Sequence, residues 1–214
     1  IIFTQGYSAT NVFYKNISYF TICSFSCSEE LISLYNSFDD QVIKDLRLNA
    51  FFEDNGDEQY RVSKVGEKVY DCFAIRSVEL YLNKAEAEAM LDKVEAIQTI
   101  KTLLHNRFEG GIPDVDGLSG KDLVSFIRDE RRRELCFEAH RWFDLRRYAV
   151  SPKYPEKKSI RHTAYDIKGK LEGDYVLKPY GEDPAWVLPI PGYEIVYNQG
   201  NLVDNPQRVD RELE

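Results

Sequence analysis

The chain has 214 residues, of which 43% are hydrophobic and 30% charged, and this balance is typical of globular proteins rather than disordered or collagen-like ones. Its 28 basic and 36 acidic side chains give a net charge of −8 at pH 7, which repels a polyphosphate backbone and argues against nucleic-acid binding. No run approaches the roughly 18 to 20 apolar residues that a membrane-spanning helix requires. The sequence therefore predicts a globular chain without a segment that crosses a bilayer.

Residues 1–27 are predicted to form a strand and loop that lead into the first helix. The first residues carry neither an initiator methionine nor a basic leader with a small-residue cleavage site, so we expect a mature, processed or truncated chain. The stretch Asn16–Ser24 is rich in β-branched and aromatic residues, which predicts a strand.

The four cysteines are too few and too scattered for a disulfide scaffold, and a chain of this length buries a core without one. Cys23 and Cys27 are separated by one residue too many for a CxxC redox motif, and no histidine lies near them to complete a zinc site. We therefore expect no metal site and no cofactor, and we interpret the cysteines as partly buried thiols: Cys23, Cys27, Cys72 and Cys136.

The first amphipathic helix is predicted to begin after Ser28, which can cap it. Its apolar face follows the helical spacing i, i+3, i+4, i+7 and comprises Leu31, Leu34, Tyr35 and Phe38. A second short helical piece is predicted over Gln41–Leu46. A hairpin is predicted over Asn49–Val62, because the Asn55-Gly56 pair readily takes the positive φ of a tight turn.

A helical hairpin is predicted over Ala74–Phe108, where apolar residues repeat with helical spacing in two blocks. The break lies at Leu91-Asp92, and Asp92 with Glu95 three residues later is typical of a capping box at the start of the second helix. The pair has the size of a tetratricopeptide repeat, about 34 residues. Only one clear copy is present, so periodicity alone does not establish a solenoid.

The longest predicted helix runs from Lys121 to about Tyr148, so residues 28–148 are expected to form the helical core. Seven of the eight prolines lie at Pro152 or beyond, which predicts an irregular covering rich in proline and tyrosine, with short strands, over 149–214. We expect 1–214 to be a single domain of mainly α class, with tetratricopeptide-like helical hairpins, irregular loops and a few short strands.

The helix predicted over Lys121–Tyr148 carries charges on its apolar face. Charges in a packed face are costly unless paired. Arg131 with Glu134, and Glu138 with Arg141, are neighbours three residues apart. The sequence therefore predicts a semi-buried structural ion network that fixes how neighbouring segments dock, made of Glu130, Arg131, Glu134, Glu138 and Arg141.

Two other interpretations of this helix are weaker. A nucleic-acid patch needs uncompensated arginines, but residues 121–150 hold eight basic and six acidic side chains. A glycosidase-like acid/base pair of Glu134 and Glu138 needs one protonated carboxyl group, whereas carboxylates beside arginines stay ionised. His140 lacks a recognisable partner motif. We therefore expect no catalytic residues and no enzyme activity.

Several segments in the same order resemble the SusD/RagB family, lipid-anchored nutrient-binding proteins of Bacteroidetes outer membranes. Arg128–Arg147 is similar to the family pattern ER-x-x-EL-x-FEG-x-RW-x-DL-R, with Ala139 in place of the usual glycine. Val78–Ala87 resembles the family's "R-x-x-E-x-x-L-x-x-AEA" helix, with Arg76 slightly displaced from the expected arginine. Ser28–Tyr35 and Asp45–Arg47 are similar to its "ELxxLY…DxR" stretch. Leu188–Pro191, Glu194 and Asn205-Pro206 resemble its C-terminal "PIPxxEI…NP" pattern.

The resemblance implies a SusD-like α-α superhelix, of which this chain resembles the C-terminal part. It also implies capture of an oligosaccharide or other nutrient at the extracellular face of the outer membrane, held by a lipid anchor outside this chain. Delivery to a SusC-like, TonB-dependent transporter would follow. Tyr7, Phe13 and Tyr14 are candidates for an aromatic platform that stacks on sugar rings. The alternative is that they pack against the helices as ordinary core residues. The alternative function is a soluble tetratricopeptide-like scaffold that binds a protein partner.

Overall fold

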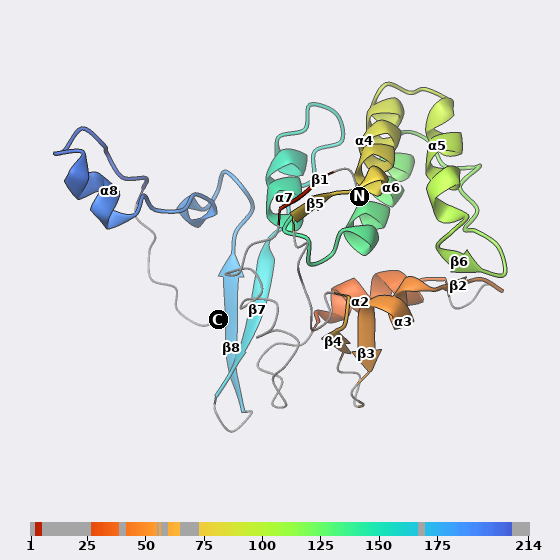
Figure 1. Cartoon of the computed structure of the whole chain (residues 1–214), viewed down its shortest axis with the longest axis horizontal. Coiled ribbons are helices and arrows are strands. Elements are labelled where there is room, and N and C mark those ends of the chain that lie inside the picture. Colours follow the sequence, from red (N-terminus) through yellow and green to blue (C-terminus); the bar gives the residue numbers. More distant parts are fainter. Residues whose placement is uncertain are drawn as a thin grey trace. The chain divides into compact units, whose positions relative to one another are not determined.

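The structure is a computed structural model of the chain (Figure 1). The residues that it describes form two compact units, 1–141 and 142–214, and each unit is considered by itself. The strand predicted over Asn16–Ser24 lies outside the described residues. Described are residues 3–5, 27–38, 42–54, 56, 60–64, 73–166 and 170–206.

The first helix, α2 (Glu29–Asn36), confirms the sequence prediction. The Ser28 side-chain oxygen accepts a hydrogen bond from the backbone N–H of Leu31 at 3.3 Å, which satisfies one of the free donors of the first turn. Leu31, Ile32 and Tyr35 are buried on one face. This face belongs to a hydrophobic cluster that also contains Cys136.

The short helix predicted over Gln41–Leu46 is wrong. The chain instead forms the strand β2 (Lys44–Asp45), which pairs with β6 (Phe108–Glu109), and helix α3 begins only at Arg47 (Arg47–Phe51). The physical reason lies in Asp45, whose carboxylate accepts a hydrogen bond from the Arg47 backbone N–H at 2.9 Å. This local bond offers the backbone an alternative to helical pairing before residue 47.

The predicted hairpin is confirmed. Strands β3 (Phe52–Asp54) and β4 (Tyr60–Val62) pair antiparallel with Phe52 opposite Val62, and both of these side chains are buried. Gly56 adopts a φ of 84° and donates its N–H to the Asp54 carboxylate at 2.8 Å. Residues 49–51, which were predicted to begin the hairpin, belong instead to α3.

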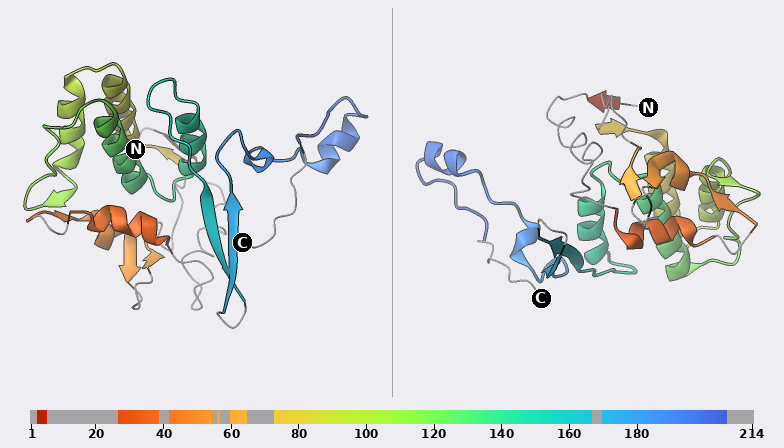
Figure 2. Two further views of the ribbon diagram at one scale, coloured as in Figure 1. Left: turned by 180° about the vertical axis from the view of Figure 1, so that it is seen from behind. Right: turned by 90° about the horizontal axis from the view of Figure 1, so that it is seen from below.

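Helices α4 (Ser77–Met90) and α5 (Glu95–Leu104) form the predicted helical hairpin and lie side by side in Figure 1 and in the left view of Figure 2. A Schellman motif ends α4: the N–H of Lys93 bonds to the Glu88 carbonyl, and Asp92 sits at a φ of 53°. The predicted capping box is wrong, because the N-cap of α5 is Val94. Strand β5 (Phe73–Ile75) leads into α4 and pairs with β1 (Phe3–Gln5).

The single helix predicted over Lys121–Tyr148 is also wrong, because two helices occupy this stretch. Helix α6 (Gly120–Glu134) packs against α4 and α2, and α7 (Arg141–Ala149) follows after a break. In the break, Phe137 and Ala139 have φ values of 61° and 64°, in the left-handed region that no continuous helix contains. Ala139 takes this conformation at the position where the resemblance expects glycine.

The second unit contains a hairpin of β7 (Ile160–Tyr165) and β8 (Leu171–Leu177) with an irregularity between Ala164 and Tyr165. Its buried centre is Trp186 in the 3-10 turn η1 (Pro184–Trp186). The Trp186 indole contacts the Trp142 ring, with centroids 4.4 Å apart, and donates to the Lys178 carbonyl at 2.7 Å. The last helix, α8 (Gly192–Tyr197), buries none of its residues.

The described residues are thus mainly helical, with short two-stranded pairings, as the fold class predicts. None of the helices among these residues is both long enough and apolar enough to cross a membrane.

Candidate functional site

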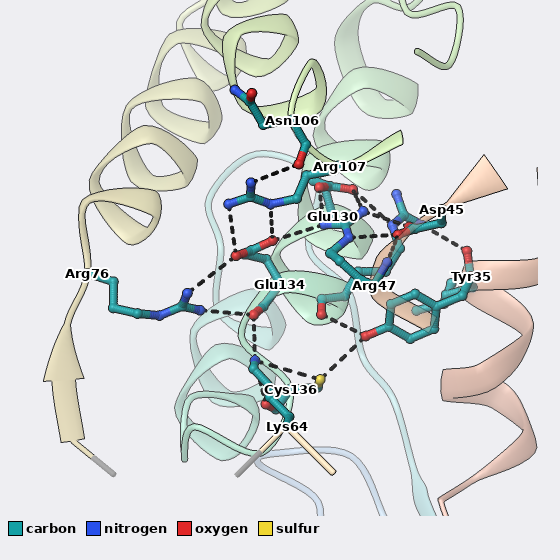
Figure 3. A network of polar contacts seen from close by, with 12 residues as sticks. Tyr35, Asp45, Arg47, Lys64, Arg76, Asn106, Arg107, Glu130, Glu134 and Cys136 are labelled. Atoms are coloured by element: carbon teal, nitrogen blue, oxygen red, sulfur yellow. Dashed lines mark hydrogen bonds and ion pairs between the residues drawn. The ribbon is translucent and has the colours of Figure 1, made fainter. Parts of the chain in front are cut away.

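Two glutamates of α6, Glu130 and Glu134, form the centre of a charged network in the first unit (Figure 3). They are one helical turn apart on one face, and their exposed fractions are 0% and 1%. Arg47 bridges them: its Nη2 lies 3.1 Å from Glu130 Oε2, and its Nη1 lies 3.1 Å from Glu134 Oε2. A single guanidinium group therefore connects α3 to two turns of α6.

Arg47 is itself enclosed by acceptors. Its Nε and Nη2 donate to the two oxygens of Asp45 at 2.9 Å and 2.7 Å, in the forked geometry that arginine makes with carboxylates. Burial alone would lower the pKa of Arg47, but Glu130 and Asp45 outweigh it and raise the pKa well above its ordinary value. Arg47 is therefore always charged.

Glu130 stays ionised for the complementary reason. Burial alone would raise the pKa of its carboxyl group, but Arg47 and Arg133 outweigh burial and lower the pKa to about 2. Arg133 is three residues along α6, with its Nε 2.9 Å from Glu130 Oε2. A carboxyl group with such a pKa holds no proton at neutral pH, so Glu130 cannot serve as a general acid there.

Glu134 joins segments that lie far apart in the sequence. Arg107, just after α5, donates from Nε to Glu134 Oε2 at 2.7 Å and from Nη2 to Oε1 at 3.2 Å. Arg76, just before α4, approaches Glu134 Oε1 at 3.4 Å and donates to its backbone carbonyl at 3.1 Å. Together with Arg47, three arginines from three different segments meet at one buried carboxylate.

The end of α6 is held by a second group of contacts. Lys64 Nζ donates to the carbonyls of Glu134 and Cys136 at 2.7 Å and 3.0 Å, which satisfies acceptors that a helix end leaves free. Glu138, in the break after α6, accepts from Lys64 Nζ at 2.6 Å and from Arg76 Nη2 at 2.6 Å. The network therefore determines where α6 stops as well as what packs on it.

Tyr35 closes the network on the α2 side (Figure 3). Its hydroxyl donates to the Arg133 carbonyl at 2.7 Å and lies 3.4 Å from Cys136 Sγ. Burial raises the pKa of the Cys136 thiol, so this cysteine stays protonated and unreactive. Cys136 is a buried free cysteine and Cys27 is half-buried, whereas Cys23 and Cys72 lie outside the described residues.

The predicted network members have different neighbours. Glu130, Glu134 and Glu138 share the arginines just named, while Arg131 points to α4, with Nη1 2.9 Å from the Asn83 amide oxygen and Nη2 3.6 Å from Glu79. Arg131 also contacts the His140 ring at 3.4 Å. Arg141 begins α7. An i, i+3 ion pair on α6 joins Glu130 to Arg133.

Sequence reasoning missed most of the cations. Arg47, Arg76 and Arg107 lie on other segments, so the helical wheel of residues 121–148 contained no signal for them. A partial signal existed: Arg47 and Asp45 stand in the resembling "DxR" stretch, and Arg76 stands near the arginine of the "R-x-x-E" helix. The pattern marked these positions without indicating that they converge on α6.

The predicted aromatic platform of Tyr7, Phe13 and Tyr14 lies outside the described residues and stays a prediction. Among the residues that the structure describes, no cluster of three or more histidine, cysteine, aspartate or glutamate side chains is arranged to hold a metal ion.

The fold and the network define a mainly helical protein in which buried arginine–glutamate pairs hold α6 against the segments around it. Residues 47–207 match the model of the SusD family. The chain belongs to this family.

Two curated relatives from Formosa agariphila share shorter segments. SusD-like protein P38 is 40% identical over 77 residues, which cover 33% of this chain and 15% of the relative. SusD-like protein P2 is 28% identical over 99 residues, which cover 42% of this chain and 15% of the relative.

A solved structure is similar over almost the whole chain. It is a SusD-like carbohydrate binding protein from Bacteroides vulgatus, with a TM-score of 0.58 and 19% sequence identity. The match covers 92% of this chain and 47% of that protein, so this chain spans about half of its length. At this identity the likeness shows the fold alone.

Proposed function

We propose that this chain is part of a non-catalytic, cell-surface protein that binds an oligosaccharide or another nutrient. The match of residues 47–207 to the SusD family carries the proposal. The similar fold of a carbohydrate binding protein from Bacteroides vulgatus supports sugars as the first ligand class to test.

The chemistry of the charged network supports binding rather than hydrolysis. A glycosidase needs one carboxyl group that donates a proton and one that acts as base or nucleophile. Glu130 has a pKa of about 2, and Glu134 is occupied by Arg47, Arg76 and Arg107. These carboxylates are therefore used in holding the helices together.

The same family membership supports a proposed partner and location. In this proposal the protein is anchored by lipid at the extracellular face of the outer membrane, through an anchor outside this chain. It delivers its ligand to a SusC-like, TonB-dependent transporter. The ligand is a glycan or other nutrient, and neither nucleic acid nor a cofactor takes part.

The test uses the full-length product purified from its native cells. We expect it to fractionate with the outer membrane, to be retained by at least one member of a panel of plant, algal and host polysaccharides in affinity electrophoresis, and to co-purify with a TonB-dependent transporter. Polysaccharide bound without shortening of its chains is the expected result.

Two results would contradict the proposal. Release of shorter oligosaccharides by the purified protein would replace it with an enzyme function. A soluble product that is retained by no polysaccharide but binds a peptide along the α4 and α5 helices would replace it with a tetratricopeptide-like scaffold.

A further inference from the structure

A pocket of about 220 Å³ lies where the first turns of α4 meet the last turn of α5. The two helices are antiparallel, so the start of one and the end of the other face the same end of the hairpin. The pocket is smaller than the 300 to 1,000 Å³ typical of sites for drug-sized ligands, so it suits one ring rather than a chain of rings. Its lining comprises Ser77, Val78, Tyr81, Thr102, Leu103, Asn106 and Arg107.

The lining divides into an apolar part and a polar part. Val78 and Leu103 are buried apolar residues, and the half-exposed ring of Tyr81 adds an aromatic surface. The polar part comes from Ser77, Thr102, Asn106 and Arg107. The Thr102 hydroxyl donates to the Gln98 carbonyl at 2.8 Å, so it can still accept a hydrogen bond. A sugar ring has matching chemistry, because its C–H face is apolar and its edge hydroxyls both donate and accept hydrogen bonds.

The polar side of the pocket is held in place by the charged network (Figure 3). Arg107 is clamped by both oxygens of Glu134, and its Nη1 donates to the Asn106 carbonyl at 3.2 Å. The Asn106 backbone N–H in turn bonds to the Leu103 carbonyl. These contacts use three of the five N–H donors of Arg107, whose carboxylate partner Glu134 also pairs with Arg47 and Arg76. The pocket therefore offers an N–H donor group held in a fixed position, which suits the hydroxyl groups of a sugar ring.

We infer that this pocket is a binding site for a single pyranose ring, with Tyr81 as the stacking surface and Asn106 as a hydrogen-bonding partner of the ring hydroxyls. The inference rests on the proposed function and assigns one sugar subsite within it. The residues of this site are different from the aromatic residues predicted from the sequence, Tyr7, Phe13 and Tyr14.

The test is a nuclear magnetic resonance titration of the ¹⁵N-labelled full chain with the methyl glycosides of glucose, galactose, mannose and xylose. The side-chain amide signals of Asn106, identified by their loss in Asn106→Ala, report directly on the pocket. We expect these signals and the backbone signals of Ser77 and Tyr81 to shift and saturate with at least one glycoside.

Three variants distinguish the loss of ring stacking at Tyr81 from effects of a substitution on the fold. Tyr81→Ala should weaken binding at least tenfold, because the stacking surface is lost. Tyr81→Phe should stay within about threefold, because it keeps the ring. Tyr197→Ala is the matched control, since Tyr197 is an exposed tyrosine of α8 in the other unit. All variants should keep the circular dichroism spectrum of the parent chain.

Several results would overturn the inference. The inference fails if no glycoside shifts the Asn106 signals. It also fails if Tyr81→Ala leaves the shifts unchanged, or if the signals respond to an apolar peptide but to no sugar. The proposed function fails separately: it fails when the full-length product is retained by no polysaccharide. If the full-length product with Tyr81→Ala retains polysaccharide as well as the parent does, the subsite inference is contradicted and the proposed function is not.

Discussion

Ion pairs of nearly equal length have different surroundings in the two units. In the first, Arg47 lies 2.7 Å from Asp45, with side-chain exposures of 4% and 1%. In the second, Arg161 lies 2.6 Å from Asp174, with exposures of 59% and 24%. Distance is therefore a poor guide to what a pair contributes. Water screens the exposed pair, whereas removing one partner of the buried pair leaves an uncompensated charge.

The same contrast holds for connectivity. The pair on the β7–β8 hairpin joins two neighbouring strands, and Thr163 adds one hydrogen bond to Asp174 at 2.7 Å. In the first unit, Glu134 alone joins Arg47, Arg76 and Arg107. We therefore expect the first unit to depend on single charged residues and the second to depend on the burial of Trp186.

The largest effect is expected for Glu130→Ala. This change leaves Arg47 and Arg133 buried without their shared carboxylate, so the free energy of unfolding should fall by about 3 to 5 kcal/mol. Urea unfolding followed by far-ultraviolet circular dichroism measures it. Glu182→Ala is the matched control, because Glu182 is a half-exposed partner of Lys157. Equal unfolding midpoints for the two variants would contradict the contrast between the units.

Lowering the pH should weaken the same network without any mutation, because the Glu130 carboxylate becomes protonated. The pKa of Glu130 is about 2 in the folded chain against an ordinary value of 4.5, so its stabilisation is complete above pH 4.5 and is lost as the pH falls towards 2. The loss amounts to about 3 kcal/mol. Unfolding free energies measured over this range should fall more steeply for the parent chain than for Glu130→Gln. Parallel pH profiles would show that Glu130 does not titrate as expected.

A smaller, opposite effect is expected for Ala139→Gly. Ala139 has a φ of 64°, a conformation that costs a non-glycine residue roughly 1 to 2 kcal/mol. Glycine should therefore raise the free energy of unfolding by about 1 kcal/mol after its own entropic cost. The control is Ala87→Gly, within α4, which should lower it by about 1 kcal/mol. Destabilisation by both changes would mean that the alanine is not strained.

The smallest effect is expected for Asp174→Ala. Thr163 and Arg161 lower the pKa of Asp174 through hydrogen bonds, but the group lies at the surface. The unfolding midpoint should stay within error of that of the parent chain. Tryptophan fluorescence is the sharpest measurement, because the two tryptophans of the chain, Trp142 and Trp186, both lie in the second unit. A clear drop would show that surface pairs also determine stability here.

The helices whose position depends on local chemistry were predictable. Ser28 and the spacing of Leu31 and Tyr35 determine α2, and the periodicity of residues 74–108 determines α4 and α5. The error over Lys121–Tyr148 occurs where long-range contacts override local preference. Residues 135–140 have a helical pattern in sequence, but Lys64 and Arg76 bind the end of α6 and Glu138 from outside the helix.

The sequence by itself determined that α6 carries glutamates on its packed face, because helical spacing is a local property of the chain. Only the tertiary structure decided which cations meet them. The arginines that contact Glu134 stand 27, 58 and 87 residues away in sequence. No local rule connects residues at such separations, since their contact depends on how helices pack. The same packing places Asn106 and Arg107 beside Tyr81 and so creates the pocket.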